Sequence, residues 1–136
     1  MEDKKTLTDE RIALARDFLS GYRVCEALLG VRRYERKRAR KIDLEETDCE
    51  ALLLGDEATW RMRMYEVEHL IASLSNSKEK IILYYRYIKG ESVEHVSDLL
   101  GFSRRTGYRL LNRGLLAVGS RLKRMNAEDF TSKKSE

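Results

Sequence analysis

The chain of 136 residues has no proline, only two cysteines, two histidines and one tryptophan. Proline interrupts helices, and a proline-free chain rich in Leu, Glu, Lys and Arg favours long helices over sandwiches or barrels. Cys25 and Cys49 lack C-x-x-C spacing, so we expect free thiols in a reducing cytoplasm rather than a disulfide or a metal site. The sequence therefore predicts an all-α protein.

Long apolar runs are also missing. The first residues, MEDKK, contain no apolar segment, and no run approaches the ~18 apolar residues that a membrane span needs. We expect a cytoplasmic protein with no membrane partner. The length suffices for one ordinary domain, or for a small domain with a helical appendage.

Charges of opposite sign are separated along the chain. Residues 31–41 carry seven basic side chains and one acid, whereas residues 42–57 carry seven acids and no base. The net charge of +4 and an isoelectric point near 9.1 indicate an anionic partner. Residues 31–41 could bind phosphate groups, but charge runs are commonly solvated helix faces, and we favour this second interpretation.

Two segments before residue 74 have helical periodicity. Apolar side chains recur at spacings of three and four from Ile12 to Leu29, which predicts an amphipathic helix that ends near Gly30. A second series follows two heptads: Trp60, Met64, Val67, Ile71 and Leu74. We expect the two helices to form an antiparallel hairpin, with a homodimer seam as the alternative. Gly55 predicts a helix end or a turn between them.

The next helix is predicted over residues 78–89 and contains three tyrosines. Such aromatic density could stack on nucleic-acid bases, but packing in the core is the commoner use, and we favour it. Gly90 is placed to end this helix, and Ser92 is placed to cap the following one.

Residues Ser92 to Leu122 predict a short helix, a turn at Gly101-Phe102-Ser103, and a second helix over 103–122 that Ser103 caps. The turn contains a glycine, and Ser97 is small where the second helix would cross the first. From residue 103 to 124 the chain has seven Lys or Arg and no acid. These features are typical of a helix-turn-helix that presents a recognition helix to double-stranded DNA, rather than of arginines that only solvate a helix.

The outward face of helix 103–122 supplies the candidate DNA-binding residues. Arginine can bind guanine with two hydrogen bonds, and asparagine can bind adenine in the same way. Residues near the start of the helix should read bases, whereas Asn112, Arg113 and the distal Arg121, Lys123 and Arg124 should contact phosphates. The predicted site consists of Ser103, Arg104, Arg105, Thr106, Tyr108, Arg109, Asn112 and Arg113.

Four short motifs carry a family resemblance: Tyr-Arg-Tyr at 85–87, Gly-x-Ser at 90–92, E-x-V-S-x-L-L-G-x-S-R at 94–104, and L-L-x-x-x-x-R-L at 115–122. Through them, residues 74–123 resemble region 4 of the sigma-70 RNA polymerase factors. The whole chain is similar to small phage-encoded regulators of the RinA/ArpU type. The resemblance implies a transcription regulator that reads promoter DNA and also contacts RNA polymerase.

Two positions depart from the sigma pattern. Arg105 stands where sigma factors usually carry a glutamate, so we expect a different base preference. Gly107 replaces a branched aliphatic residue, which costs up to ~1 kcal/mol of helix stability as well as lost packing. A close approach of the two helices, or filling of the space by Tyr85 or Phe102, would compensate.

Enzymatic function is not expected, because the sequence has no Gly-rich phosphate loop and no nucleophile with a placed base. Glu66-x-x-His69 is half of a di-iron carboxylate motif, but the second half is missing. We therefore predict no catalytic residue, no metal and no cofactor. Two rivals to a regulator are a small terminase-like DNA-packaging subunit and a polymerase adaptor that does not read DNA.

The predicted organisation has three parts. Residues 1–73 form a helical region that joins two copies of the chain as a homodimer, residues 74–124 form the helix-turn-helix domain, and residues 125–136 form a flexible tail.

Overall fold

The computed structural model describes the backbone of residues 4–41 and 49–134, and the side chains of residues 5–40 and 55–125. Every regular element in these ranges is helical, which confirms the all-α fold class. The elements are α1 (Lys4–Lys41), α2 (Cys49–Ala72), α3 (Ser77–Leu83), the π-helical turn η1 (Tyr84–Ile88), α4 (Val93–Leu100) and α5 (Arg104–Lys134).

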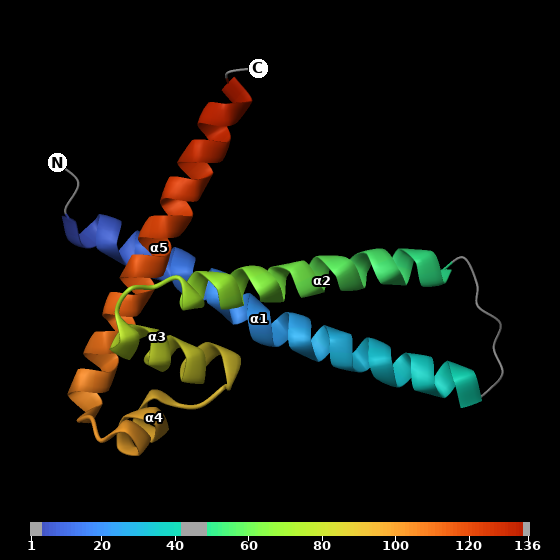
Figure 1. Cartoon of the computed structure of the whole chain (residues 1–136), viewed down its shortest axis with the longest axis horizontal. Helices are drawn as coiled ribbons and strands as arrows, with labels where there is room; N and C mark the ends of the chain where they lie inside the picture. Colours follow the sequence, from blue (N-terminus) through green and yellow to red (C-terminus); the bar gives the residue numbers. More distant parts are fainter. Residues whose placement is uncertain (1–3, 42–48, 135–136) are drawn as a thin grey trace.

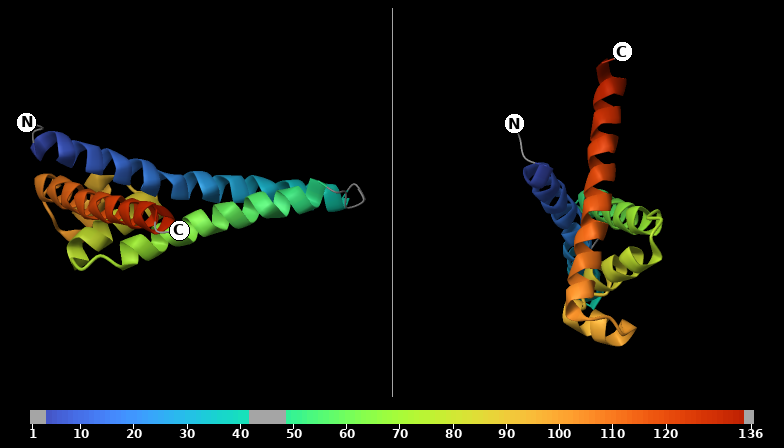
Figure 2. Two further views of the ribbon diagram at one scale, coloured as in Figure 1. Left: turned by 90° about the horizontal axis from the view of Figure 1, so that it is seen from above. Right: turned by 90° about the vertical axis from the view of Figure 1, so that its left-hand side faces the viewer.

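Helices α1 and α2 lie side by side as a long antiparallel hairpin, and α5 crosses the N-terminal half of α1 (Figures 1 and 2). Helices α3 and α4 pack against the first half of α5, at the end of the molecule opposite the tip of the hairpin. The predicted hairpin is therefore confirmed. Val67, Ile71 and Leu74 of the heptad series are buried, and Met64 packs against the same core.

The predicted ends at Gly30 and Gly55 are wrong, because both glycines lie inside helices. An isolated glycine in a helix costs only ~1 kcal/mol relative to alanine. Residues 31–41 are mostly Arg, Lys, Glu and Ala, which are good helix formers, and α2 pairs with them across the hairpin. Helix propensity and pairing together outweigh the cost of each glycine.

Helix α5 also continues beyond its predicted end at Leu122, as far as Lys134. The predicted tail therefore begins within a helix, although its side chains from residue 126 lie outside the described ones. The division into residues 1–73 and 74–124 stays a prediction. Its boundary cuts through one continuous core, to which every helix from α1 to α5 contributes buried side chains.

The crossing of α1 and α5 brings the two backbones together at Gly119. A Cβ atom added at Gly119 would collide with the carbonyl oxygen of Arg11 and would lie 3.0 Å from its Cα. Arg11 Nη1 also donates a hydrogen bond to Ser120 Oγ, at 3.5 Å. Because a backbone cannot turn aside as a side chain can, only glycine fits here without moving one of the helices.

We therefore predict that Gly119→Ala lowers the free energy of unfolding by about 1–3 kcal/mol, the usual cost of overpacking. Gly30→Ala is the matched control, because it lies in the exposed middle of α1 with nothing within 4 Å of an added Cβ. It should raise the free energy of unfolding by up to ~1 kcal/mol. Denaturant unfolding followed by circular dichroism measures both, and equal effects of the two substitutions would contradict the close crossing.

Candidate nucleic-acid interface

Side-chain caps and one left-handed glycine fix the corner between α4 and α5. Ser92 Oγ accepts a hydrogen bond from the backbone N–H of His95, and Ser103 Oγ accepts one from that of Thr106, both at 3.1 Å. Gly101 has φ +76°, a conformation that favours glycine. Phe102 N–H closes the turn by donating to the Ser97 carbonyl at 2.8 Å. The predicted caps and the glycine turn are confirmed.

The loss of helix stability at Gly107 is offset by a close approach of α5 to α4. A Cβ added there would collide with Ser97 Oγ, and would lie 3.3 Å from Ser97 Cβ and 3.4 Å from Val93 Cγ1. Ser97 is fully buried, and its hydroxyl has no hydrogen-bond partner among the described residues. Of the two compensations expected from the sequence, the structure has the close approach, with Ser97 as the small residue at the crossing.

This corner leaves one face of the first three turns of α5 open to solvent. Among the predicted site residues, Thr106 is half-buried beside the cap. The others are exposed: Ser103, Arg104, Arg105, Tyr108, Arg109, Asn112 and Arg113. Within the described residues, Arg105, Arg109 and Arg113 form no ion pair. The structure therefore brings the predicted residues together on one basic surface, which we call the α5 face.

Tyr108 links the α5 face to α4 in a way that the sequence did not predict. Its hydroxyl donates a hydrogen bond to the carboxylate of Glu94, in the first turn of α4. This hydrogen bond lowers the pKa of Glu94 and raises the pKa of Tyr108. The α5 face therefore has one carboxylate at its edge, and a carboxylate can accept a hydrogen bond from the N4 amino group of cytosine.

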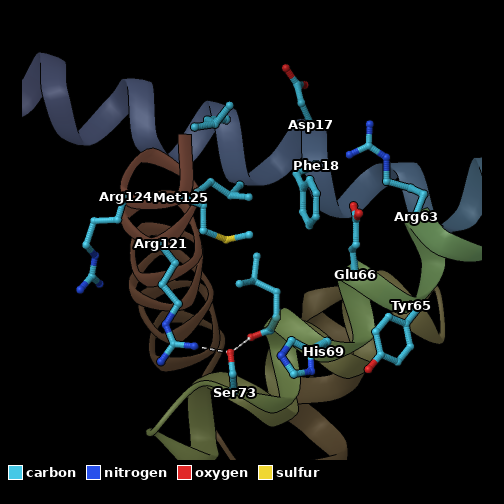
Figure 3. A pocket seen from close by; sticks show the side chains of 13 residues that line it. Asp17, Phe18, Arg63, Tyr65, Glu66, His69, Ser73, Arg121, Arg124 and Met125 are labelled. Carbon is cyan, nitrogen blue, oxygen red and sulfur yellow. Dashed lines mark hydrogen bonds between the residues drawn. The ribbon is translucent and has the colours of Figure 1, made fainter. Parts of the chain in front are cut away.

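Two of the three distal basic residues have partners within the protein, and the third, Arg124, is exposed. The guanidinium of Arg121 donates to Ser73 Oγ at the end of α2 (Figure 3), and Lys123 Nζ lies 3.5 Å from Glu10 Oε2 on α1. Both contacts link the hairpin to α5, and that of Lys123 is an exposed ion pair that contributes little to stability. Among the described residues of this helix, the exposed basic side chains are grouped between Arg104 and Arg113, with Arg124 apart from them.

A pocket of about 920 Å³ opens between α1, α2 and α5 (Figure 3). The residues that line it carry charges of both signs: Arg63, Arg121 and Arg124, together with Glu66 and, at the rim, Asp17, whose carboxylate points away from the pocket in Figure 3. Two of its arginines already have partners in the protein: Arg121 binds Ser73, and the Arg63 guanidinium lies 5.2 Å from the centre of the Phe18 ring. The pocket therefore lacks the uniform basic character of the α5 face.

The basic stretch after Gly30 forms the last turns of α1. Arg36 Nη2 lies 2.6 Å from an oxygen of Glu57, a carboxylate that is only 2% exposed, and Arg32 lies 3.9 Å from Asp56. Two arginines of this stretch thus hold the hairpin together, while Arg33, Arg38 and Arg40 are exposed. This arrangement favours a solvated helix face over a phosphate-binding arm.

Among the residues whose placement is described, no three His, Cys, Asp or Glu side chains gather as a metal site. In the same part of the chain, no helix is apolar over a length that would cross a membrane.

A family model described as "protein of unknown function", DUF1492, matches residues 40–118, which is more than half of the chain. The chain belongs to this family. The DUF1492 match runs from the end of α1 through α2, α3 and α4 and includes the α5 face. No curated protein and no solved structure matches the chain.

We predict that the contact between Gly107 and Ser97 couples their substitutions. Gly107→Ala should lower the free energy of unfolding by about 1–3 kcal/mol through overpacking. Ser97→Ala should be nearly neutral, because it removes a hydroxyl that has no partner in the described structure. In the Ser97→Ala background the penalty of Gly107→Ala should shrink by at least ~0.5 kcal/mol, as measured in a double-mutant cycle. The same penalty in both backgrounds would refute the close approach.

Proposed function

We propose that this chain is a sequence-specific, DNA-binding transcription regulator that inserts the first three turns of α5 into the major groove. The observation that supports this most strongly is the α5 face itself. Arg105, Arg109 and Arg113 lie one turn apart, exposed and without ion pairs among the described residues. The major groove is about 12 Å wide and admits a helix with its side chains.

The corner between α4 and α5 supports the proposal because it holds α5 rigidly while leaving its start accessible. The caps at Ser92 and Ser103 and the contact of Gly107 with Ser97 fix the angle between the helices. Figure 1 shows α4 and the start of α5 at one end of the molecule, away from the hairpin tip. A recognition helix needs this combination of rigidity and access.

Within the proposed complex, residues at the start of α5 read bases and later ones contact phosphates. Arg104, Arg105 and Arg109 are assigned to base edges, and Asn112 and Arg113 to phosphates. Tyr108 acts together with Glu94, to which it is hydrogen-bonded. Ser103 and Thr106 lie at the capped end, where their hydroxyls are 2.9 Å apart and close to any bound phosphate.

The resemblance of residues 74–123 to sigma region 4 extends the proposal. It supports a promoter-like DNA target, a contact with RNA polymerase as second partner, and an origin in a phage or prophage. In this role the protein would act in the cytoplasm.

The proposal predicts that Arg105→Ala or Arg109→Ala weakens binding to the preferred DNA by about 1–3 kcal/mol, and binding to random DNA much less. Selection of bound duplexes from a random pool first identifies the preferred sequence, and fluorescence anisotropy at fixed salt then measures affinity. Arg16→Ala is the matched control, because it removes the same charge from an exposed site on α1. It should leave both affinities almost unchanged.

Three results would contradict parts of this proposal. An equal loss on preferred and random DNA for Arg105→Ala would refute base reading. A pool without an enriched sequence, together with binding to RNA polymerase, would indicate an adaptor instead of a regulator. Large rings detected by light scattering would indicate a terminase-like packaging subunit.

A further inference from the structure

The side of α1 that faces away from α2 and α5 carries exposed apolar side chains. Val24 is 59% exposed, Val31 is 54% exposed, and Leu28 between them is 38% exposed. The buried residues of the same helix, such as Leu19 and Leu29, occupy the opposite face. Apolar side chains grouped in this way on a charged helix indicate a contact surface.

The two valines belong to a longer series with a spacing of seven residues: Asp17, Val24, Val31 and Arg38. All four side chains are exposed, and a spacing of seven, close to two helical turns, puts them on one face. We call these four residues and Leu28 the α1 ridge. It has apolar side chains in its middle and opposite charges at its two ends.

We propose that the α1 ridge binds the α1 ridge of a second copy of this chain, with the two helices antiparallel and the two-fold axis between Ala27 and Leu28. Val24 then packs against the partner's Val31, and the reverse, since the two positions are equally far from the axis. Asp17 and the partner's Arg38 meet at each end for the same reason. A two-fold contact must be self-complementary, and this ridge satisfies that condition.

The charges also decide the orientation. In a parallel pair, Asp17 would face a second Asp17, and Arg38 would face a second Arg38, so that both ends repel. In the antiparallel pair both ends attract. Charges that flank an apolar seam commonly select the orientation of helical pairs in this way.

The ridge is short, so the dimer is weak. From Asp17 to Arg38 it spans roughly 32 Å at 1.5 Å per residue, and its width is that of one helix, about 10 Å. An interface of roughly 300 Å² per copy is below the standard size for specific complexes, so the dimer is transient and we expect a Kd in the upper micromolar range. The α1 ridge consists of residues of α1 alone, so the dimer forms whether or not the protein binds DNA.

Sedimentation equilibrium of the full chain tests the surface. Val24→Lys should raise the dimer Kd at least tenfold, because it places a charge in the seam. Met62→Lys is the matched control, since Met62 is 58% exposed on α2, outside the ridge, and its Kd should equal that of the wild type. A wild-type chain that stays monomeric at millimolar concentration would overturn the proposal, as would equal effects of the two substitutions in variants with unchanged helical content.

Charge reversal and cross-linking test the orientation. Asp17→Arg and Arg38→Asp should each weaken the dimer, and the double variant should restore it, because the end pairs are then re-formed with their signs exchanged. In a Cys49→Ser background, an equimolar mixture of Val24→Cys and Val31→Cys chains should form a disulfide-linked dimer under mild oxidation. Each variant alone should not, since like positions are then about 10 Å apart, too far for a disulfide. Efficient linking of Val24→Cys to itself, or no rescue in the double variant, would overturn the antiparallel arrangement.

Discussion

The structure depends on how closely α5 approaches α4 and α1, and one glycine of α5 at each of these two crossings sets the distance. At Gly107 the helix lies directly on Ser97 of α4, and at Gly119 it lies on the backbone of Arg11 in α1. Glycine lowers helix propensity at both positions, and the buried contacts on either side offset that cost. The direction of α5 is thus fixed at two points, one near the α5 face and one near the hairpin.

The hairpin is therefore packed together with the helices that carry the α5 face. Arg23 of α1 donates a hydrogen bond to the carbonyl of Ile88 at 3.4 Å, at the end of η1, and its guanidinium lies against Gly90. Arg121 of α5 binds Ser73 at the end of α2. These contacts join the N-terminal helices to the segment that orients α4. A substitution in the hairpin can consequently alter the corner without touching it.

Local signals in the sequence predicted the local features, and long-range contacts decided the others. Ser92, Ser103 and Gly101 act within a few residues, so their roles could be predicted from spacing alone. The continuation of α1 past Gly30 depends on helix-forming residues after the glycine and also on pairing with α2, which no local pattern contains. The hydrogen bond of Tyr108 with Glu94, and that of Arg121 with Ser73, join residues 14 and 48 positions apart. The exposed arginines of the α5 face could be predicted from the sequence. The hydrogen-bond partners of Tyr108 and Arg121, Glu94 and Ser73, could not.

The crossing of α1 and α5 at Gly119 links the proposed dimer to the proposed binding of DNA. If two copies pair through the α1 ridge, the same two-fold axis relates their α5 faces. DNA read by such a pair would be pseudo-palindromic, because the symmetry of the protein is mirrored in its site. The contact between α1 and α5 involves backbone, so the direction of α5 relative to the axis cannot adjust as it would through a flexible linker. The distance between the two half-sites should therefore be nearly fixed, and the weak dimer would gain affinity only on DNA with that spacing.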